Sequence, residues 1–207
     1  MRWSVMIPVK RLPLAKSRLN DGTRPPGAHR RLALALALDT TAAALDCPAV
    51  ARVVAVTDDR QAARRLAALG AVVVPDQPDG GLNPALEYGA SRAAALGPAD
   101  GIAVLSADLA ALRPAELGAA LAAAAGHRRA FVPDAAGTGT TLLAALPGVP
   151  LRPRYGPRSR AAHRASGAVE LAGEWPSLRH DVDTAADLAE ATRLGLGPAT
   201  SAAVTVR

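Results

Sequence analysis

The feature that most constrains the fold is a regular alternation of short apolar runs with longer helical patterns. The apolar runs have strand length and lack the alternating polar positions of a half-exposed strand, which is typical of strands buried in parallel sheets. The stretches between them are rich in Ala, Leu and Arg, with Gly or Pro at their boundaries. This order predicts an α/β fold, with a mostly parallel, doubly wound sheet in a single domain.

The expected elements follow from these patterns. We expect strands at Trp3 to Val9, Arg52 to Thr57, Ala71 to Val74, Gly101 to Ser106, Ala130 to Pro133, Leu142 to Leu146 and Val169 to Leu171. We expect helices at Ala28 to Leu45, Asp59 to Leu69, Pro84 to Leu96, Arg113 to Ala125, Arg158 to Gly167 and Ala185 to Leu194. Strict Leu/Ala alternation within the first helix could mimic a strand, but its Ala content and length favour helix. Residues 195–207 give no firm assignment.

Composition narrows the class of partner. Half of the 207 residues are hydrophobic but only 2% are aromatic, so the core must consist of Ala, Leu and Val. The net charge of +6 suits an anionic partner. Proteins that bind single-stranded nucleic acid interleave aromatic with basic residues, and here the aromatic residues are scattered, so small anions are favoured over nucleic acid.

Cysteine usage and hydropathy indicate the compartment. The single cysteine, Cys47, rules out an internal disulfide and a Cys-based zinc cluster, and we expect it to be a small buried or loop thiol. The N-terminus lacks the pattern of a signal peptide, and no apolar stretch reaches the roughly 18 to 20 residues of a membrane span. We therefore expect a cytoplasmic protein without a membrane partner.

A cationic stretch follows the first strand. Lys10, Arg11, Lys16 and Arg18 come after Pro8 with almost no acidic residue among them. Ligands of open α/β sheets bind beyond the carboxyl ends of the strands, so this stretch predicts an anionic ligand such as a polyphosphate. A solvated basic loop is the alternative.

Three carboxylates indicate a cation site. Asp108 directly follows a buried strand, and Asp181 and Asp183 are spaced i, i+2 on an extended segment, with Val182 on the opposite side. Such oxygen ligands suit Mg²⁺. The alternative is that Asp108 or Asp183 caps the helix that follows it.

Two glycine-containing turns predict a second anion site. Gly137 to Thr141 reads GTGTT and offers permissive backbone with hydroxyl and N–H donors. Arg154 to Ser159 reads RYGPRS and places Ser159 at the start of a helix. Each turn alone is a weak signal, because Gly/Thr turns are common and the arginines could form a solvated helix face.

A third glycine-containing loop, at Asp79 to Asn83, suits recognition of a base. Gly80 and Gly81 allow a flat group to approach the backbone, and Asn83 offers both a donor and an acceptor. A plain turn that ends in an Asn N-cap is an equal alternative. We interpret Asp58 and Asp59 chiefly as a helix cap.

Several ordered motifs together resemble one family. They read IPVKRLPLAKSRL, DGGLNPAL, SADLAAL, FVPDAAGTGTTLL, RYGPRSRAAHRASGA and LRHDVDTAADL, and they span about residues 4 to 190. On these motifs the sequence resembles the CofC/FbiD family, the guanylyltransferases of coenzyme F-420 biosynthesis, whose fold is that of MobA-like nucleotidyltransferases. It departs from the family's Asp-Leu-Pro, which here is Asp108-Leu109-Ala110, and this puts the rigidity of that loop in doubt.

The resemblance implies a reaction and its partners. GMP would be transferred from GTP to phosphoenolpyruvate with Mg²⁺, giving enolpyruvyl-2-diphospho-5'-guanosine and pyrophosphate, and the next enzyme of the pathway is a further expected partner. The same reaction on 2-phospho-L-lactate or 3-phosphoglycerate is the alternative. More distant alternatives are another MobA-like nucleotidyltransferase and a non-catalytic anion-binding module.

The resemblance also implies roles for particular residues. The nucleotide would be bound by Lys10, Lys16, Arg18, Gly80, Gly81 and Asn83, the metal by Asp108, Asp181 and Asp183, and the acceptor by Thr141, Gly156 and Ser159. Lys16 and Asp108 would be catalytic. The single domain, 1–207, would divide into a nucleotide half of about 1–110 and an acceptor and metal half of about 111–195.

Overall fold

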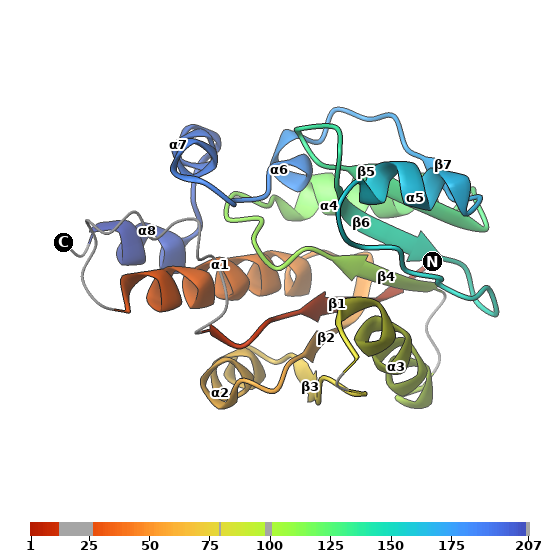
Figure 1. Ribbon diagram of the computed structural model, residues 1–207, viewed down its shortest axis with the longest axis horizontal. Coiled ribbons are helices and arrows are strands. Elements are labelled where there is room, and N and C mark those ends of the chain that lie inside the picture. Colours follow the sequence, from red (N-terminus) through yellow and green to blue (C-terminus); the bar gives the residue numbers. More distant parts are fainter. Residues whose placement is uncertain (13–26, 79, 98–100, 206–207) are drawn as a thin grey trace.

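The computed structural model describes residues 1–12, 27–78, 80–97 and 101–205. Within these ranges, seven strands form one sheet in the order β3-β2-β1-β4-β6-β5-β7 (Figure 1). Their bounds are β1 Trp3–Pro8, β2 Val50–Val56, β3 Val72–Val74, β4 Gly101–Leu105, β5 Arg129–Pro133, β6 Thr140–Ala145 and β7 Val169–Glu170. All seven expected strands are therefore present.

Most neighbouring strands of the sheet run parallel. β1 pairs in parallel with both β2 and β4, β2 with β3, and β5 with β7. The exception is β6, which lies antiparallel between β4 and β5. The chain builds outward from β1 to β3 and then returns to the other side of β1, so the strand order reverses between β1 and β4. The predicted mostly parallel, doubly wound sheet is confirmed.

The helices follow the expected order, with two additions. They are α1 Ala28–Leu45, α2 Arg60–Ala68, α3 Leu82–Ala95, α4 Pro114–Ala124, α5 Ser159–Ala165, α6 Pro176–Arg179, α7 Ala185–Leu194 and α8 Pro198–Thr205. The sequence did not predict α6, which is a single turn, or α8. The start of α8 is held by a distant residue, because the Asp39 carboxylate accepts hydrogen bonds from the backbone N–H groups of Ala199 and Thr200.

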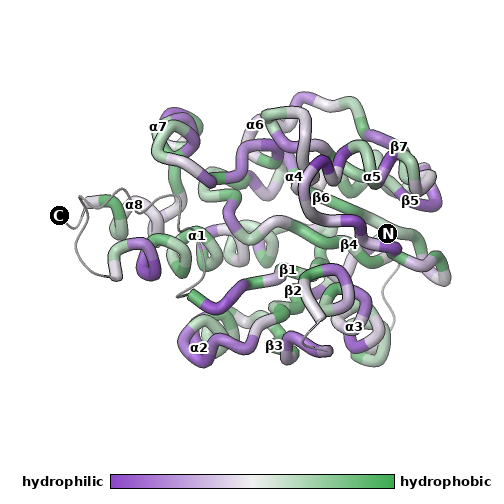
Figure 2. Tube along the Cα trace, in the orientation of Figure 1, coloured by the Kyte–Doolittle hydropathy of each residue, from purple (hydrophilic) through white to green (hydrophobic). Residues whose placement is uncertain are grey.

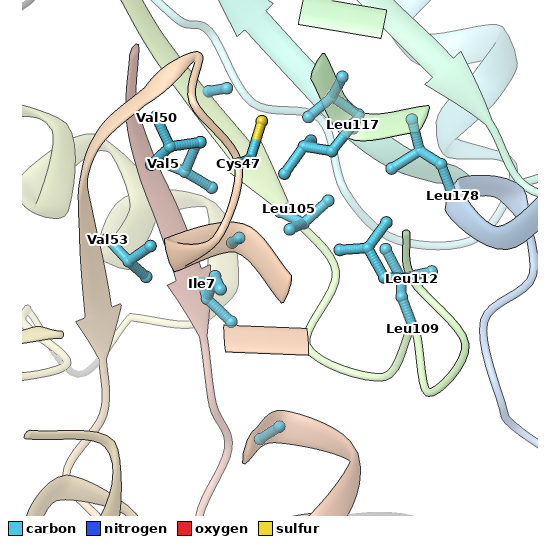
Figure 3. Close-up of a cluster of buried hydrophobic side chains, with 14 of the residues drawn as sticks. Val5, Ile7, Cys47, Val50, Val53, Leu105, Leu109, Leu112, Leu117 and Leu178 are labelled. Carbon is cyan, nitrogen blue, oxygen red and sulfur yellow. The ribbon is translucent and has the colours of Figure 1, made fainter. Parts of the chain in front are cut away.

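Helices cover both faces of the sheet. One hydrophobic cluster joins the strands to α1, α2, α4 and α6, and Figure 3 shows Val5 and Ile7 of β1 in it, together with Leu105 and Leu117. A second cluster on the opposite face joins the strands to α3. Cys47 lies within the first cluster with its side chain 1% exposed, and burial raises the pKa of its thiol. The expectation of a buried thiol is confirmed.

The Leu/Ala-rich helix α1 is buried from two directions. Leu34 and Leu38 pack into the cluster against the sheet, whereas Leu32 and Leu36 pack with α7 in a further cluster. A helix covered on both sides needs apolar residues nearly all round, which explains a sequence without an amphipathic period. In Figure 2 much of α1 and the central strands is hydrophobic, whereas α2 carries hydrophilic residues. None of the helices in the described ranges combines the length and the apolar character that a membrane span requires.

Candidate active site

A pocket of about 700 Å³ opens where the strand order reverses. Its walls include the end of β1 with Pro8 to Lys10, and the end of β4 with Val104 to Asp108. Open α/β sheets bind ligands at this position, outside the carboxyl ends of the strands. The volume lies within the range of about 300 to 1,000 Å³ that is typical of small-molecule sites.

The predicted cationic stretch begins at this pocket. Lys10 lines it and is exposed. The chain beyond is anchored, because the backbone N–H of Leu12 donates to the Asp59 carboxylate at 2.9 Å. Lys16 and Arg18 lie outside the described residues, so their contact with phosphate stays a prediction.

Asp59 has two roles. Its other carboxylate oxygen accepts hydrogen bonds from the N–H groups of Gln61 and Ala62, which confirms it as the N-cap of α2. Asp58 is not part of this cap; it accepts from the N–H of Asp76 and lies 3.7 Å from the guanidinium of Arg11. The predicted cap therefore also fixes the start of the cationic stretch.

The structure brings the three predicted metal ligands into electrostatic contact. Asp108 and Asp183 line the pocket, and the segments that carry them are joined because the N–H of Val182 donates to the Asp108 carbonyl at 3.1 Å. Burial, and then the charges of Asp108, Asp183 and Asp134, raise the pKa of Asp181 to about 7. Val182 is fully buried, as its expected position opposite the two carboxylates requires.

Neither Asp108 nor Asp183 is a helix cap. The N-cap residue of α4 is Arg113, and α7 begins with a capping box in which Thr184 and Asp187 bond each other's backbone N–H groups. The structural alternative for these two carboxylates is therefore wrong. Their position at the pocket needs another explanation.

The carboxylates fit a hard cation by their chemistry. Carboxylate oxygens are the ligands that Mg²⁺ prefers, and a cation would offset both the burial and the carboxylate charges that raise the pKa of Asp181. Among the described residues, however, no group of three or more His, Cys, Asp or Glu side chains is arranged so that it could hold a metal ion. The role of Asp108, Asp181 and Asp183 as metal ligands therefore stays a prediction.

Asp134 is a site residue that the sequence reasoning missed. Its carboxylate accepts hydrogen bonds from the N–H groups of Thr138 and Gly139, both at 2.8 Å, and these two residues line the pocket. A Cβ on Gly139 would lie 2.4 Å from a carboxylate oxygen of Asp134, so this turn requires glycine. The sequence signal for Asp134 was its position between a strand and a Gly/Thr turn, since Asp side chains often accept hydrogen bonds from the backbone of the turn that follows.

The predicted acceptor residues lie at different depths. Gly156 lines the pocket, and its φ of 139° favours glycine. Ser159 is 3% exposed, and its hydroxyl donates to that of Thr140 at 3.3 Å. Thr141 is fully buried, and its carbonyl accepts from the N–H of Ser106. The contact of these residues with an acceptor stays a prediction.

The glycine loop before α3 is built differently from the expected turn. The N-cap of α3 is Gly81, with φ 94°, so the interpretation of Asn83 as an N-cap is wrong. Instead the Asn83 amide oxygen accepts from the N–H of Tyr155 at 2.8 Å, and its NH₂ donates to the Tyr155 carbonyl at 3.0 Å. Asn83 therefore connects α3 to the RYGPRS segment. The guanine contact of Gly80, Gly81 and Asn83 stays a prediction.

Thr40 of α1 supports the loop that carries Asp108. Its buried hydroxyl accepts from the N–H of Leu109 at 3.0 Å and donates to the Leu36 carbonyl. We expect Thr40→Val to lower stability by about 1 to 3 kcal/mol, because the buried N–H of Leu109 loses its acceptor. Activity should fall as well, because the neighbouring carboxylate shifts. Thermal denaturation and turnover measure the two effects.

Thr41 provides the matched control for this substitution. It is the next residue on α1, it is equally buried, and its hydroxyl has no hydrogen-bond partner within the described part of the chain. Thr41→Val should therefore leave stability and activity nearly unchanged. Equal losses in the two variants would contradict the role of Thr40.

Comparison with known proteins agrees with this geometry. Residues 31–181 match the family model of the MobA-like NTP transferase domain. Over 201 residues, the chain is 60% identical to a phosphoenolpyruvate guanylyltransferase of Salinispora arenicola, covering 96% of this chain and 92% of the relative. The chain belongs to the phosphoenolpyruvate guanylyltransferase family. The resemblance seen in the motifs is thereby confirmed.

Further relatives of this guanylyltransferase family agree. The chain is 58% identical over 203 residues to the phosphoenolpyruvate guanylyltransferase of Streptomyces coelicolor, covering 98% of this chain and 95% of the relative. Among solved structures it is similar to the 4-diphosphocytidyl-2C-methyl-D-erythritol synthase of Anaerococcus prevotii, with a TM-score of 0.61 and 10% identity, covering 93% and 95% of the two chains. At this identity the similarity shows the fold alone. The chain is an enzyme of the nucleotidyltransferase class.

Proposed function

We propose that this chain transfers GMP from GTP to phosphoenolpyruvate, releasing pyrophosphate, as a step in coenzyme F-420 biosynthesis. The observation that carries the proposal is the meeting of Lys10 with the carboxylates of Asp108 and Asp183 in one pocket at the reversal of the strand order. Family membership supports the same reaction, because the relatives bear the name phosphoenolpyruvate guanylyltransferase.

The cationic stretch would bind the triphosphate of GTP. Lys10 stands at the pocket, and Lys16 and Arg18 follow it in sequence. These side chains would offset the negative charge of the nucleotide, and Lys16 would stabilise charge that develops on the leaving pyrophosphate. The loop that contains Gly80, Gly81 and Asn83 would contact the guanine.

The acceptor would enter from the wall formed by the two later turns. Thr138, Gly139 and Gly156 line this wall, and Thr141 and Ser159 lie behind it. The phosphate of phosphoenolpyruvate is already ionised at neutral pH, so attack on the α-phosphorus needs alignment and charge neutralisation, and it needs no protein base. This is consistent with a pocket that combines cationic and carboxylate side chains.

Asp108, Asp181 and Asp183 would hold Mg²⁺. The ion would supply neutralisation of the two reacting phosphates when bound. The role of the chain is to bring Asp108 and Asp183 to the pocket with Asp181 within reach of their charges, and burial together with these charges raises the pKa of Asp181. The nucleotide half, about 1–110, and the acceptor and metal half, about 111–195, thus both contribute to one site. With GTP and phosphoenolpyruvate as substrates, we expect the enzyme to act in the cytoplasm.

The test measures the release of pyrophosphate from GTP in the presence of Mg²⁺. Three acceptors are tested in parallel: phosphoenolpyruvate, 2-phospholactate and 3-phosphoglycerate. We expect phosphoenolpyruvate to be preferred. Because the product could be unstable, the assay includes the next enzyme of the pathway to consume it. No turnover with any acceptor, or a clear preference for another nucleotide, would overturn the proposal.

A further inference from the structure

One wall of the pocket is an irregular segment that depends on outside support. Residues 154–158 form no helix or strand, yet Tyr155, Gly156, Pro157 and Arg158 all line the pocket. Its own backbone contributes one turn, in which the N–H of Ser159 donates to the Gly156 carbonyl at 3.1 Å, and contacts with other elements add further support. Two side chains provide such contacts at consecutive residues, Asn83 at Tyr155 and His163 at Arg154.

His163 of α5 is a fully buried residue that the reaction itself does not use. Its Nε2 accepts a hydrogen bond from the N–H of Arg154 at 2.9 Å, and its Nδ1 lies 2.9 Å from the hydroxyl oxygen of Thr140. Its ring packs against that of Tyr155 in an edge-to-face arrangement, with the ring centroids 5.1 Å apart. His163 therefore touches the segment at both a peptide group and a side chain.

These partners fix the proton on the His163 ring. A backbone N–H can only donate, so Nε2 must present a lone pair to Arg154. Burial, together with the charges of Arg129 and Arg154, lowers the pKa of His163 to about 4, so the ring is neutral at pH 7. The single ring proton is then on Nδ1, and Nδ1–H donates to Thr140.

The same contacts connect the segment to the Gly/Thr turn. The Thr140 hydroxyl oxygen that accepts the hydrogen bond from His163 also accepts one from the hydroxyl of Ser159. The register of β5 and β6 shifts between Val132 and Pro133, which pair with Leu142 and Thr140, so Thr141 is an extra residue at this point. Such bulges redirect neighbouring side chains. His163 thus joins both of the turns that form the acceptor wall.

We propose that His163 is a positioning residue for the acceptor. With its proton on Nδ1, the His163 ring holds residues 154–158 in the shape that binds phosphoenolpyruvate. This inference rests on the proposed function. His163 is not a catalytic residue, because its side chain has no exposed surface with which to touch a substrate. Its effect should therefore appear in the binding of one substrate.

Three variants separate the contacts of His163. His163→Gln can place its amide oxygen near Nε2 and keep the bond from Arg154. His163→Asn can place its NH₂ near Nδ1 and keep the bond to Thr140, but it does not reach Arg154. His163→Phe keeps the packed ring and loses both bonds. We expect the KM for phosphoenolpyruvate to rise at least about 10-fold in the Asn and Phe variants, and to stay within about 3-fold of the wild type in the Gln variant.

The KM for GTP should stay unchanged in all three variants. The matched control is Arg164→Gln, one residue along the same helix, which removes an exposed ion pair with Glu170 and should alter neither KM. A parallel change in both KM values, or a rescue by Asn and not by Gln, would overturn the proposal. If the Phe variant does not fold, the comparison of the Gln and Asn variants still shows whether the hydrogen bond from Arg154 determines the KM for phosphoenolpyruvate. Absence of turnover in the wild type would instead overturn the proposed function.

A measurement without substrate tests the geometry directly. In ¹⁵N-histidine-labelled protein, the signals of His163 are identified by their loss in the Gln variant, and their shifts distinguish the two neutral tautomers. We expect the Nδ1–H form at pH 7. An Nε2–H or doubly protonated ring would exclude acceptance from Arg154 and overturn the inference, whether or not the enzyme turns over.

Discussion

Asp183→Asn is expected to lower the turnover of GTP with phosphoenolpyruvate by at least about 100-fold while the fold stays intact. Asp183 lines the pocket and is exposed, so the substitution leaves the core untouched. The expected size corresponds to the loss of one preorganised electrostatic contact with a transition state. Pyrophosphate release at saturating substrate measures the activity, and circular dichroism checks the fold.

Asp187→Asn is the matched control for this loss of charge. It removes one carboxylate charge four residues away, in the capping box of α7, and keeps an acceptor oxygen for the backbone N–H groups of Asp183 and Thr184. We expect a loss of about 1 kcal/mol in stability and turnover within about 3-fold of the wild type. Retained activity in Asp183→Asn would remove this residue from the proposed metal site. An equal loss of turnover in both variants would mean that the segment, and not the carboxylate, matters.

Asp181→Asn is expected to stabilise the metal-free protein at pH 8 while turnover is lost. Burial and three neighbouring carboxylates raise the pKa of Asp181 to about 7 from 3.8. Each pKa unit corresponds to about 1.4 kcal/mol, so keeping this group charged costs at most about 4 kcal/mol of stability. At about 2 to 4 °C per kcal/mol, we expect the melting temperature of the variant to exceed that of the wild type by several degrees.

The pH dependence of this effect has a definite sign. Between about pH 4 and pH 7 the unfolded chain has lost the Asp181 proton, whereas the folded chain still binds it. The free energy of unfolding of the wild type therefore falls as the pH rises through this window. The variant has no titrating group at position 181, so its free energy of unfolding does not show this decrease. The two melting temperatures should converge near pH 4. Adding Mg²⁺ at pH 8 should stabilise the wild type more than the variant, and a constant difference at every pH would contradict the account.

Much of the architecture could be predicted from local patterns. Buried strands and Ala-rich helices differ in length and period, so the alternation alone was enough to predict the seven strands and six of the helices. The same reasoning placed Asp108 at the end of a buried strand, where α/β sheets bind ligands. Asp181 and Asp183 were predicted from their spacing around Val182. These features depend on residues that are close together in the sequence.

Other features depend on residues that are far apart in the sequence. Asp39 caps a helix about 160 residues later, and Asn83 binds the backbone of Tyr155. Neither contact leaves a pattern in the chain, since an Asp within a helix and an Asn after two glycines both suit several local roles. For the same reason the sequence suggested an N-cap role for Asn83 that the structure does not bear out.

The sequence by itself determined the α/β class, the order of the elements along the chain, the family and the polar residues that follow the strands. It did so because the length, apolar content and Gly/Pro boundaries of each element, and the family motifs, are local features of the chain. Only the tertiary structure decided which members of the two acceptor turns face the pocket and which lie behind it. Gly156 lines the pocket whereas Ser159 and Thr141 are buried, because a bulge and the contacts of His163 orient these turns.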